Sequence, residues 1–271
     1  MRLTLKNVLA IPLEAEQISP GLLRGKSALE VAKTPLLYGN AEVPLGDFFD
    51  IKGQHCKDHL HLEGNLSRVK HLARGMNQGL LTIDGPVGMH LGAGMSGGEI
   101  RVQGDVGDWL GAQMKGGLIS IQGRAGHLVG AAYWGEKRGM TGGTIIIHGQ
   151  AGNEIGNRMA RGLLVVTGDC GDFAGVQMRA GTIIVLGKSG LRPGANMRRG
   201  TIILAHSQIL LPTFNFCCAY KPPFLPLLAR ALEKEGVALS SVQNQLCSRY
   251  LGDTNELGKG EILICNQMPV A

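Results

Sequence analysis

Residues 79–97 read GLLTIDGPVGMHLGAGMSG, and residues 98–116 read GEIRVQGDVGDWLGAQMKG. Both follow the pattern G-x-[IL]-x-[IV]-x-G-x-x-G-x-x-x-G-x-x-M-x-x, which occurs six times between Gly79 and Gly200, once with seven additional residues. A fixed period of this length is typical of solenoids and arrays, in which each unit packs on its neighbours.

The start of each unit predicts a short β-strand. Its third and fifth residues are aliphatic and alternate with other residues, as in Leu81/Ile83 and Ile100/Val102. This period of two is typical of a strand with one buried face. The outward positions between them become apolar toward the C-terminal units, which predicts a surface covered by a partner or by the C-terminal segment: Thr82, Arg101, Ser120, Ile146, Val165 and Ile184.

Glycines follow each strand at spacings of three and four residues, too often for a helix, where each would cost about 1 kcal/mol relative to alanine. They predict corners with positive φ or with close approach between units. We expect this at the corner glycines, which are Gly88, Gly107, Gly126, Gly152, Gly171 and Gly190. One strand and two corners describe one coil of a parallel β-helix, so we predict an all-β fold of about seven coils.

Methionine occupies the same position in every unit. Such a column is either flexible core filler or a soft recognition surface, and its place beside aliphatic columns favours the core. The column methionines are Met95, Met114, Met140, Met159, Met178 and Met197.

The composition fits one main domain with appendages. The chain has 271 residues, 44% of them apolar, and 31 of its 42 glycines lie between Gly79 and Gly200, so the glycine content belongs to the repeat. Its six cysteines show no C-x-x-C motif or framework spacing, which predicts reduced thiols. With no signal peptide or membrane-spanning run, we predict a cytoplasmic protein without membrane contact.

The net charge of +6 is concentrated late in the repeat. Between Arg158 and Arg199 there are seven basic residues and two acidic ones. Five arginines lie within two residues of a column methionine, and stacking would gather them along one edge: Arg158, Arg161, Arg179, Arg198 and Arg199. This basic edge suits an extended polyanion or an acidic partner, or is an ordinary solvated edge. Nucleic acid is not expected, because aromatics are only 4% of the chain.

The flanks predict caps for the two open ends of the stack. We predict an N-terminal capping segment at 1–54, with a short helix near 27–33, and a repeat domain at 55–206 that includes a degenerate first coil at 55–76. A C-terminal α/β cap at 207–271 would hold a helix at 224–235 and a strand at 261–265.

The seven additional residues lie between Gly130 and Met140 and predict a loop that projects from one face. This inserted loop carries Tyr133, Trp134, Lys137 and Arg138. An aromatic pair on such a loop is either a partner-docking anchor or packs against the wall of the repeat.

Catalytic and metal-binding patterns are weak. His59 and His61 would point to one side of a strand, but the sequence offers no further ligand at a sensible spacing, so we predict no metal site and no catalytic residue on this chain. The recurring pairs Asp105/Asp108 and Asp169/Asp172 occupy equivalent corners, which indicates repetition and not a catalytic dyad. The glycines do not fit a phosphate-binding loop or a nucleophile elbow.

The chain resembles the third, or C, subunit of formylmethanofuran dehydrogenase and of the related formyltransferase/hydrolase complex. The resemblance covers about 200 of 271 residues and is most specific at Arg138-Gly139-Met140-Thr141-Gly142-Gly143-Thr144 and Asn153-Glu154-Ile155-Gly156. The same coil is similar to the C-terminal domain of the glutamate synthase large subunit. The resemblance implies a right-handed parallel β-helix without an active site of its own.

The resemblance also implies a role as scaffold and linker in a complex that processes formyl groups on methanofuran or methylofuran. Its partners would be a zinc hydrolase-type A subunit, a B-type subunit and a formyltransferase-type D subunit. Zinc, and molybdenum or tungsten in the dehydrogenase, would lie on those other subunits. The polyglutamyl tail of the furan carrier would be a polyanion for the basic edge. The scattered cysteines and high arginine content favour the bacterial formyltransferase/hydrolase, which transfers formyl from tetrahydromethanopterin to the furan carrier and hydrolyses it to formate, over the archaeal dehydrogenase that reduces carbon dioxide.

The alternative class is an independent enzyme, either a β-helix lyase or a hexapeptide-repeat acyltransferase. Hexapeptide coils repeat every eighteen residues and this chain repeats every nineteen, while a lyase needs acids and bases clustered on one outer sheet. Activity of the isolated chain distinguishes these enzymes from a scaffold.

Overall fold

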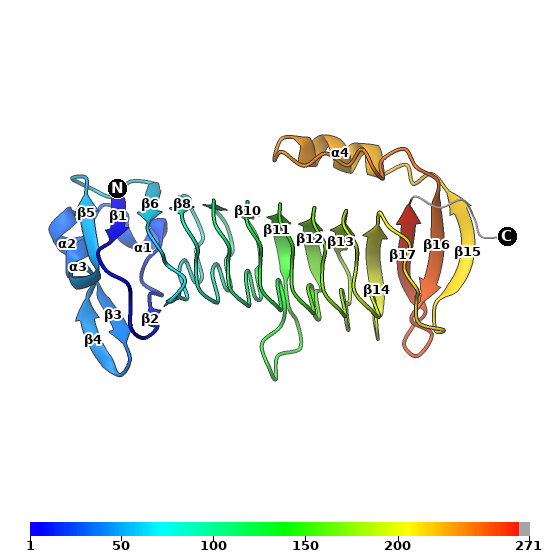
Figure 1. Ribbon diagram of the computed structural model, residues 1–271, viewed down its shortest axis with the longest axis horizontal. Coiled ribbons are helices and arrows are strands. Elements are labelled where there is room, and N and C mark those ends of the chain that lie inside the picture. Colours follow the sequence, from blue (N-terminus) through cyan, green and yellow to red (C-terminus); the bar gives the residue numbers. More distant parts are fainter. Residues whose placement is uncertain (266–271) are drawn as a thin grey trace.

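The computed structural model describes residues 1–265, so the predicted cap at 207–271 extends beyond the described residues. The protein is β-rich, as expected. Thirteen strands form one sheet in the order β15-β16-β17-β14-β13-β12-β11-β10-β9-β8-β6-β1-β5, and four more form a small sheet in the order β4-β3-β2-β7. Figure 1 shows the large sheet as a long row of strands with helices at one end and over one face.

The elements before the repeat are β1 (Arg2–Leu5), β2 (Leu13–Glu14), α1 (Pro20–Leu23), α2 (Ala28–Ala32), β3 (Pro35–Tyr38), β4 (Ala41–Pro44), α3 (Leu45–Phe48) and β5 (Phe49–Lys52). The repeat carries β6 (His59–Glu63), β7 (Val69–Lys70), β8 (Leu80–Asp84), β9 (Glu99–Val102), β10 (Leu118–Ile121), β11 (Thr141–Ile147), β12 (Arg161–Val166), β13 (Thr182–Val185) and β14 (Arg199–Leu204). After it come β15 (Asn215–Tyr220), α4 (Leu225–Glu233), β16 (Cys247–Gly252) and β17 (Lys259–Cys265).

Successive units pair in parallel through equivalent residues. Leu81 pairs with Ile100, Ile100 with Ile119, and Ile119 with Ile145 across the enlarged unit. A second column of single parallel bridges runs beside the sheet through Leu66, Val87, Val106, Ala125, Ala151, Cys170 and Ser189. The degenerate unit at 55–76 joins both columns, because β6 pairs in parallel with β8 and Leu66 bridges Val87.

The column methionines are completely buried, which confirms their prediction as core residues. The methyl groups of the first five column methionines lie against a glycine that opens a following unit, and the methyl group of Met197 lies against Gly260 in β17. A Cβ atom on Gly117 would stand 2.7 Å from Cε of Met95, and one on Gly162 would stand 2.7 Å from Cε of Met140. These opening glycines also have positive φ, for example +91° at Gly117. The methionine column therefore occupies space that only glycine leaves free.

Of the two alternatives expected at the corner glycines, positive φ or close approach between units, the structure has close approach. A Cβ atom on Gly152 would stand 2.7 Å from Nδ1 of His127 and 2.8 Å from the carbonyl oxygen of Gly126. None of the six corner glycines has positive φ, so their backbone conformation is also accessible to other residues. What is missing at these positions is the space for a side chain.

Acidic and amide side chains at the corners bind the next unit. Asp105 and Asp108 accept hydrogen bonds at 2.7 Å from the backbone N–H groups of Arg124 and His127. Asp169 and Asp172 do the same for Lys188 and Leu191 at 2.7 Å. The interpretation of these pairs as structural repetition is therefore confirmed.

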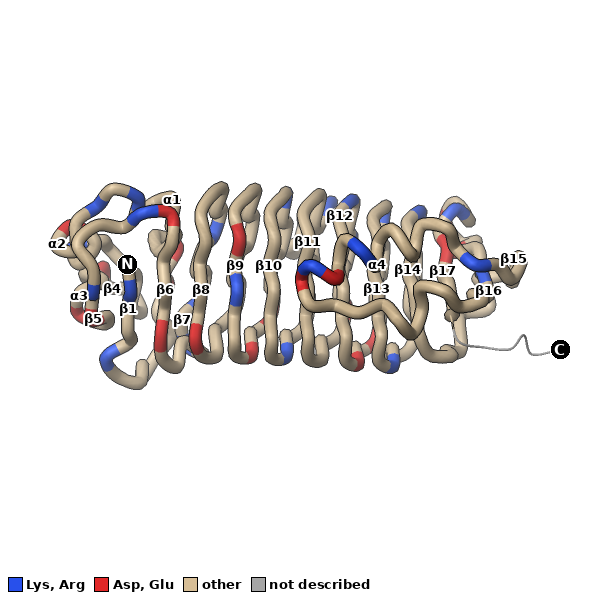
Figure 2. The backbone as a smooth tube through the Cα atoms, turned by 90° about the horizontal axis from the view of Figure 1, so that it is seen from above, with Lys and Arg blue, Asp and Glu red and all other residues tan. Residues whose placement is uncertain are grey.

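Helix α4 covers the outward apolar stripe. Ile146, Val165, Ile184 and Ile203 are buried in one cluster with residues of the C-terminal segment: Leu225, Ala229 and Leu232 of α4, and Val237, Leu239 and Val242 after it. Figures 1 and 2 show α4 lying over β11 to β14. Of the two predicted covers, the structure thus has the C-terminal segment. The predicted helix at 27–33 and strand at 261–265 are also present, as α2 and β17.

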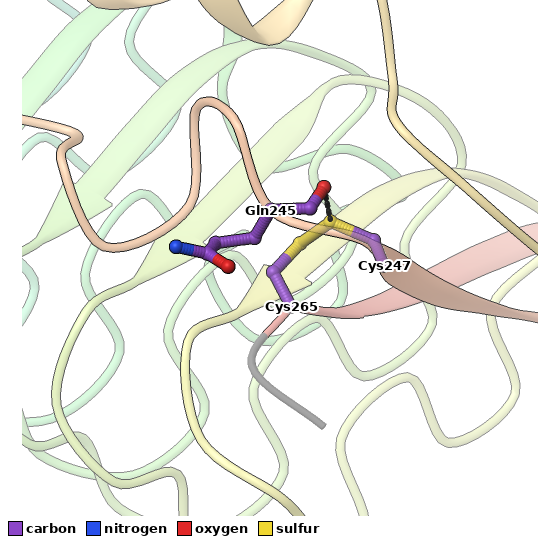
Figure 3. Close-up of a disulfide and its surroundings, with 3 residues drawn as sticks. All are labelled: Gln245, Cys247 and Cys265. Carbon is purple, nitrogen blue, oxygen red and sulfur yellow. Dashed lines mark hydrogen bonds between the residues drawn. A yellow bond between two sulfur atoms is a disulfide. The ribbon is translucent and has the colours of Figure 1, made fainter. Parts of the chain in front are cut away.

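The prediction that all six cysteines are reduced is wrong for one pair. Cys247 and Cys265 form a disulfide (Figure 3), while Cys56, Cys170, Cys217 and Cys218 are free. The reason is the antiparallel register of β16 and β17, which places Cys247 directly opposite Cys265. Their separation of 18 residues gave no recognisable motif.

Candidate functional site

Three of the five arginines of the predicted basic edge meet in one cavity of about 340 Å³. We call this cavity the basic groove. It is lined by Gly135, Glu136, Lys137, Arg158, Gln177, Arg179, Asn196, Arg198 and Glu256. The inserted loop forms one wall and the turn that contains Glu256 forms the other. Figure 1 shows the loop before β11 and the turn between β16 and β17 projecting from the same side of the stack.

The repeat explains this convergence. Arg179 and Arg198 each directly follow a column methionine, and Arg158 directly precedes one, so stacking places them on consecutive units. Arg158 donates from Nε to Oε1 of Gln177 at 2.7 Å and from Nη1 to the carbonyl oxygen of Glu136 at 2.8 Å. Arg158 thereby connects Gln177, which also lines the groove, to the inserted loop.

The remaining two arginines lie elsewhere. Arg161 and Arg199 begin strands β12 and β14, where they pair in register with Thr141 and Lys259. Neither lines the basic groove. The predicted five-arginine edge is therefore three arginines plus Lys137. Arg161 and Arg199 are two residues after their column methionine, and this one position beyond that of Arg179 and Arg198 moves the side chain from the groove to a strand.

A carboxylate limits the positive charge of the groove. Arg198 donates from Nε to Oε2 of Glu256 at 2.9 Å, an ion pair across 58 residues of sequence. Sequence reasoning missed Glu256, since it lies outside the repeat. Gln177 and Asn196 were also missed, although both directly precede a column methionine and an alignment of the units reveals that position.

A second cavity of about 360 Å³ lies on the other side of the inserted loop. Its lining includes Gln113, Lys115, Glu136, Lys137 and Arg138. Lys137 lines both cavities, while Arg138 lines only the second. The inserted loop therefore separates two polar hollows, each with lysine or arginine at its border.

The two aromatic residues of the inserted loop behave differently. Tyr133 stacks on Trp109 with ring centroids 4.8 Å apart, and its hydroxyl is 2.9 Å from Nδ1 of His90. Trp134 contacts Trp109 edge-on yet remains 80% exposed. Tyr133 thus packs against the wall of the repeat, and Trp134 is presented to solvent. Of the two roles predicted for this aromatic pair, Tyr133 has the packing role, and docking by Trp134 stays a prediction.

His90 lies within an aromatic column. Its ring stacks on His71 at 4.4 Å, and both histidines have positive φ, as does Trp109 in the next unit. Burial lowers the pKa of His90 to about 4, with a smaller contribution from the positive charge of His71. Burial likewise raises the pKa of Tyr133. Both groups are therefore neutral at pH 7, which suits a stacked aromatic cluster.

His61 has two acidic neighbours that the sequence analysis did not find. Its Nε2 is 3.0 Å from Oε1 of Glu63 and 3.1 Å from Oδ2 of Asp84. These three side chains could hold a metal ion. However, Nε of Arg2 lies 3.3 Å from the same Glu63 oxygen, so that carboxylate already has a cationic partner. Glu63 follows on the same strand, and Asp84 is brought in by the parallel register of β6 and β8.

Two C subunits of formylmethanofuran dehydrogenases are similar to part of the chain. The C subunit of molybdenum-containing formylmethanofuran dehydrogenase 1 from Methanothermobacter thermautotrophicus is 45% identical over 85 residues, which is 31% of this chain and 21% of that protein. The C subunit of tungsten-containing formylmethanofuran dehydrogenase 2 from Methanothermobacter marburgensis is 39% identical over 91 residues, 32% of this chain and 34% of that protein. The matched part spans about a fifth to a third of these relatives.

The full-length match is structural. The GXGXG motif model matches residues 62–214. A chain in the crystal structure of the formyltransferase/hydrolase complex from Methylorubrum extorquens, in complex with methylofuran, superposes with a TM-score of 0.90 at 35% identity, covering 98% of this chain and 100% of that one. The chain belongs to the family of formylmethanofuran dehydrogenase C subunits. The resemblance found in the sequence is thus confirmed. The likeness to this chain also includes the segments before and after the repeat.

Among the helices of residues 1–265, none has both the length and the apolar character that a bilayer span requires.

Proposed function

We propose that the chain is the C subunit, a scaffold and linker without an active site of its own, of a formyltransferase/hydrolase complex that uses methylofuran or methanofuran. The observation that carries this proposal is the full-length likeness to one chain of such a complex. The reaction of the whole assembly would be formyl transfer from tetrahydromethanopterin to the furan carrier, followed by hydrolysis to formate. Zinc would lie on another subunit.

The architecture suits a scaffold. We interpret the repeat as a right-handed parallel β-helix of about seven coils over residues 55–206, capped by 1–54 and 207–271. The support is the second bridged column, which has seven members from Leu66 to Ser189, one per coil. Right-handedness is the overwhelmingly preferred hand for a connection between parallel strands of one sheet.

The partners would be the A, B and D subunits and the carrier itself, with no nucleic acid and no membrane, in the cytoplasm. Trp134 would dock on another subunit, because a large exposed aromatic side chain on a loop fixed by Tyr133 needs little further ordering on binding. Arg158, Arg179, Arg198 and Lys137 would hold the polyglutamyl tail of the carrier, since one carboxylate per residue complements a row of cations.

The test is co-expression with the A, B and D subunits followed by purification through a tag on this chain. We expect all four subunits to copurify with formyl transfer and hydrolysis activity, and to lose activity when this chain is omitted. Purification of this chain alone, or a fully active complex without it, would contradict the proposal.

A second candidate is the C subunit of a molybdenum or tungsten formylmethanofuran dehydrogenase. It is favoured by the identity of 45% to such a protein, although over 85 residues only. Copurification of a molybdenum- or tungsten-containing partner in place of a formyltransferase would select it.

A further inference from the structure

The edge strand β15 contains an irregularity next to two adjacent cysteines. Phe216 pairs with Tyr250, but Cys218 pairs with Arg249, so that three residues of β15 face two of β16. Cys217 is therefore the extra residue of a β-bulge. Bulges of this kind re-aim a side chain and are treated as selected features of a strand, not as defects.

The bulge changes what two neighbouring thiols can do. In a regular strand, consecutive side chains point to opposite faces, so the thiols of Cys217 and Cys218 could not meet. In β15 the bulge at Cys217 interrupts this alternation. Desolvation raises the pKa of Cys218, and the neighbouring Cys217 raises it further. Both cysteines are exposed.

The surroundings favour chemistry at this pair over the other free cysteines. Cys56 and Cys170 are buried and therefore shielded from a small-molecule disulfide, whereas Cys217 and Cys218 are exposed. Arg249, which is opposite Cys218, counteracts the rise in the pKa of Cys218. Two register pairs further along the strand, Tyr220 lies opposite Cys247, which forms the disulfide with Cys265 (Figure 3).

We propose that Cys217 and Cys218 form a vicinal dithiol that is reversibly oxidised to a disulfide by a small-molecule disulfide such as glutathione disulfide. One thiolate attacks the glutathione disulfide and releases one glutathione thiolate, which leaves a mixed disulfide. The second cysteine then attacks the protein sulfur of that bond and releases the second glutathione. Two cysteine thiols are oxidised, one glutathione disulfide is reduced to two glutathione thiols, and the protons of the cysteines pass to the products.

A disulfide between Cys217 and Cys218 is expected to be easily reduced. Consecutive Cα atoms are about 3.8 Å apart, below the usual span of about 4.4–6.8 Å for disulfide-bonded residues. Strain of this kind makes a disulfide easier to reduce, and strained, exposed disulfides are the regulatory ones. The Cys217–Cys218 bond should therefore form and open under conditions that leave Cys247–Cys265 intact. This site does not depend on the proposed role in a formyl-processing complex.

The test is mass spectrometry of the full chain after incubation with glutathione disulfide and then with a mild thiol reductant. Cleavage with trypsin yields residues 200–230, which contain Cys217 and Cys218 and no other cysteine. We expect this peptide to lose two hydrogen atoms without gaining glutathione, and to regain them on reduction. The Cys217→Ser variant should instead carry one glutathione on Cys218, and the Cys170→Ser control should behave as wild type.

Three outcomes would overturn the proposal: a wild-type peptide with two glutathiones, one with a single stable glutathione, or one without reaction. Phenylarsine oxide gives an independent check, because trivalent arsenic bridges two adjacent thiols. One equivalent should bind to the reduced wild-type protein and none to Cys217→Ser. Equal binding by both proteins would show that the two thiols do not act as a pair.

Discussion

Nδ1 of His127 accepts a hydrogen bond from the backbone N–H of Asn153 at 2.9 Å. The same corner holds Asp108 in the preceding unit and Asn153 in the next, and their Oδ1 atoms bind the following units at 2.7 and 3.0 Å. An imidazole thus replaces a carboxylate or amide oxygen in a column of side-chain acceptors. The acceptor, and not the residue type, is what the stack requires at this position.

We expect His127→Ala to lower the free energy of unfolding by about 1 kcal/mol, because the N–H of Asn153 loses its partner. His127→Asn should cost much less, since the chain itself uses asparagine at the equivalent position 153. Thermal and chemical unfolding of both variants provide the measurement. Equal stability of the two variants would show that this hydrogen bond does not hold neighbouring units together.

The contact of Gly152 with the preceding unit predicts a larger effect. Gly152→Val should destabilise the protein by several kcal/mol, because its side chain would overlap His127 and the backbone of Gly126. Gly135→Val is the matched control. Gly135 has positive φ, but a Cβ atom added there would have no neighbour within 4 Å, so only the backbone conformation opposes substitution. A Gly152→Val protein as stable as wild type would contradict the close stacking of corners.

The stacked histidine predicts a pH dependence of stability. The pKa of His90 is about 4 in the folded protein and about 6.5 when unfolded, so the unfolded chain binds more protons between these values. Stability should therefore be fully present above pH about 6.5 and fall as the pH drops toward 4, by at most about 3 kcal/mol. His90→Gln should flatten this part of the curve, whereas substitution of the exposed His206 should not. An unchanged curve in His90→Gln would assign the acid sensitivity to other groups.

The repeat accounts for what the sequence predicts well. Each column has one position in every unit, so the strands, the buried methionines and the convergence of Arg158, Arg179 and Arg198 follow from the period alone. The period does not decide between the two reasons for glycine that were left open at the corners. Glycine permits positive φ but is equally required where space is missing, and the corner glycines are of the second kind.

Contacts outside the repeat could not be predicted. Glu256 reaches Arg198 from a turn 58 residues further along the chain, and Cys265 reaches Cys247 through a strand register that no local motif encodes. These contacts depend on how the capping segments fold back, and the order of residues carries little information about that.

For the isolated chain we predict neither stoichiometric zinc binding nor ester, glycoside or acyl-transfer turnover. Arg2 is already paired with Glu63, which weakens the group of His61, Glu63 and Asp84 as a metal site. Elemental analysis after dialysis against zinc, with the His59→Ala/His61→Ala variant as control, tests the first statement. One equivalent retained by wild type and lost in the variant would overturn it, and turnover by the isolated chain would favour an independent enzyme.

The last prediction concerns the basic groove. Charge reversal of Arg179 and Arg198 to glutamate should reduce retention of the furan carrier or assembly of the complex, because it replaces two cations of the groove by anions beside Glu136 and Glu256. The loss should be largest below about 0.1 M salt, where exposed charges act over more than about 10 Å. Binding of poly-glutamate to the complex across a salt series measures it.

The chain provides the matched control. Arg161→Glu/Arg199→Glu changes the net charge equally, but both residues are on strands and neither lines the groove. If the groove binds the polyanion, the first pair should weaken binding at least about tenfold, which is about 1.4 kcal/mol, and the second pair much less. Equal effects of both pairs would mean that net charge alone attracts the polyanion. Wild-type assembly and carrier retention in the Arg179/Arg198 variant at low salt would show that the groove is an ordinary solvated edge.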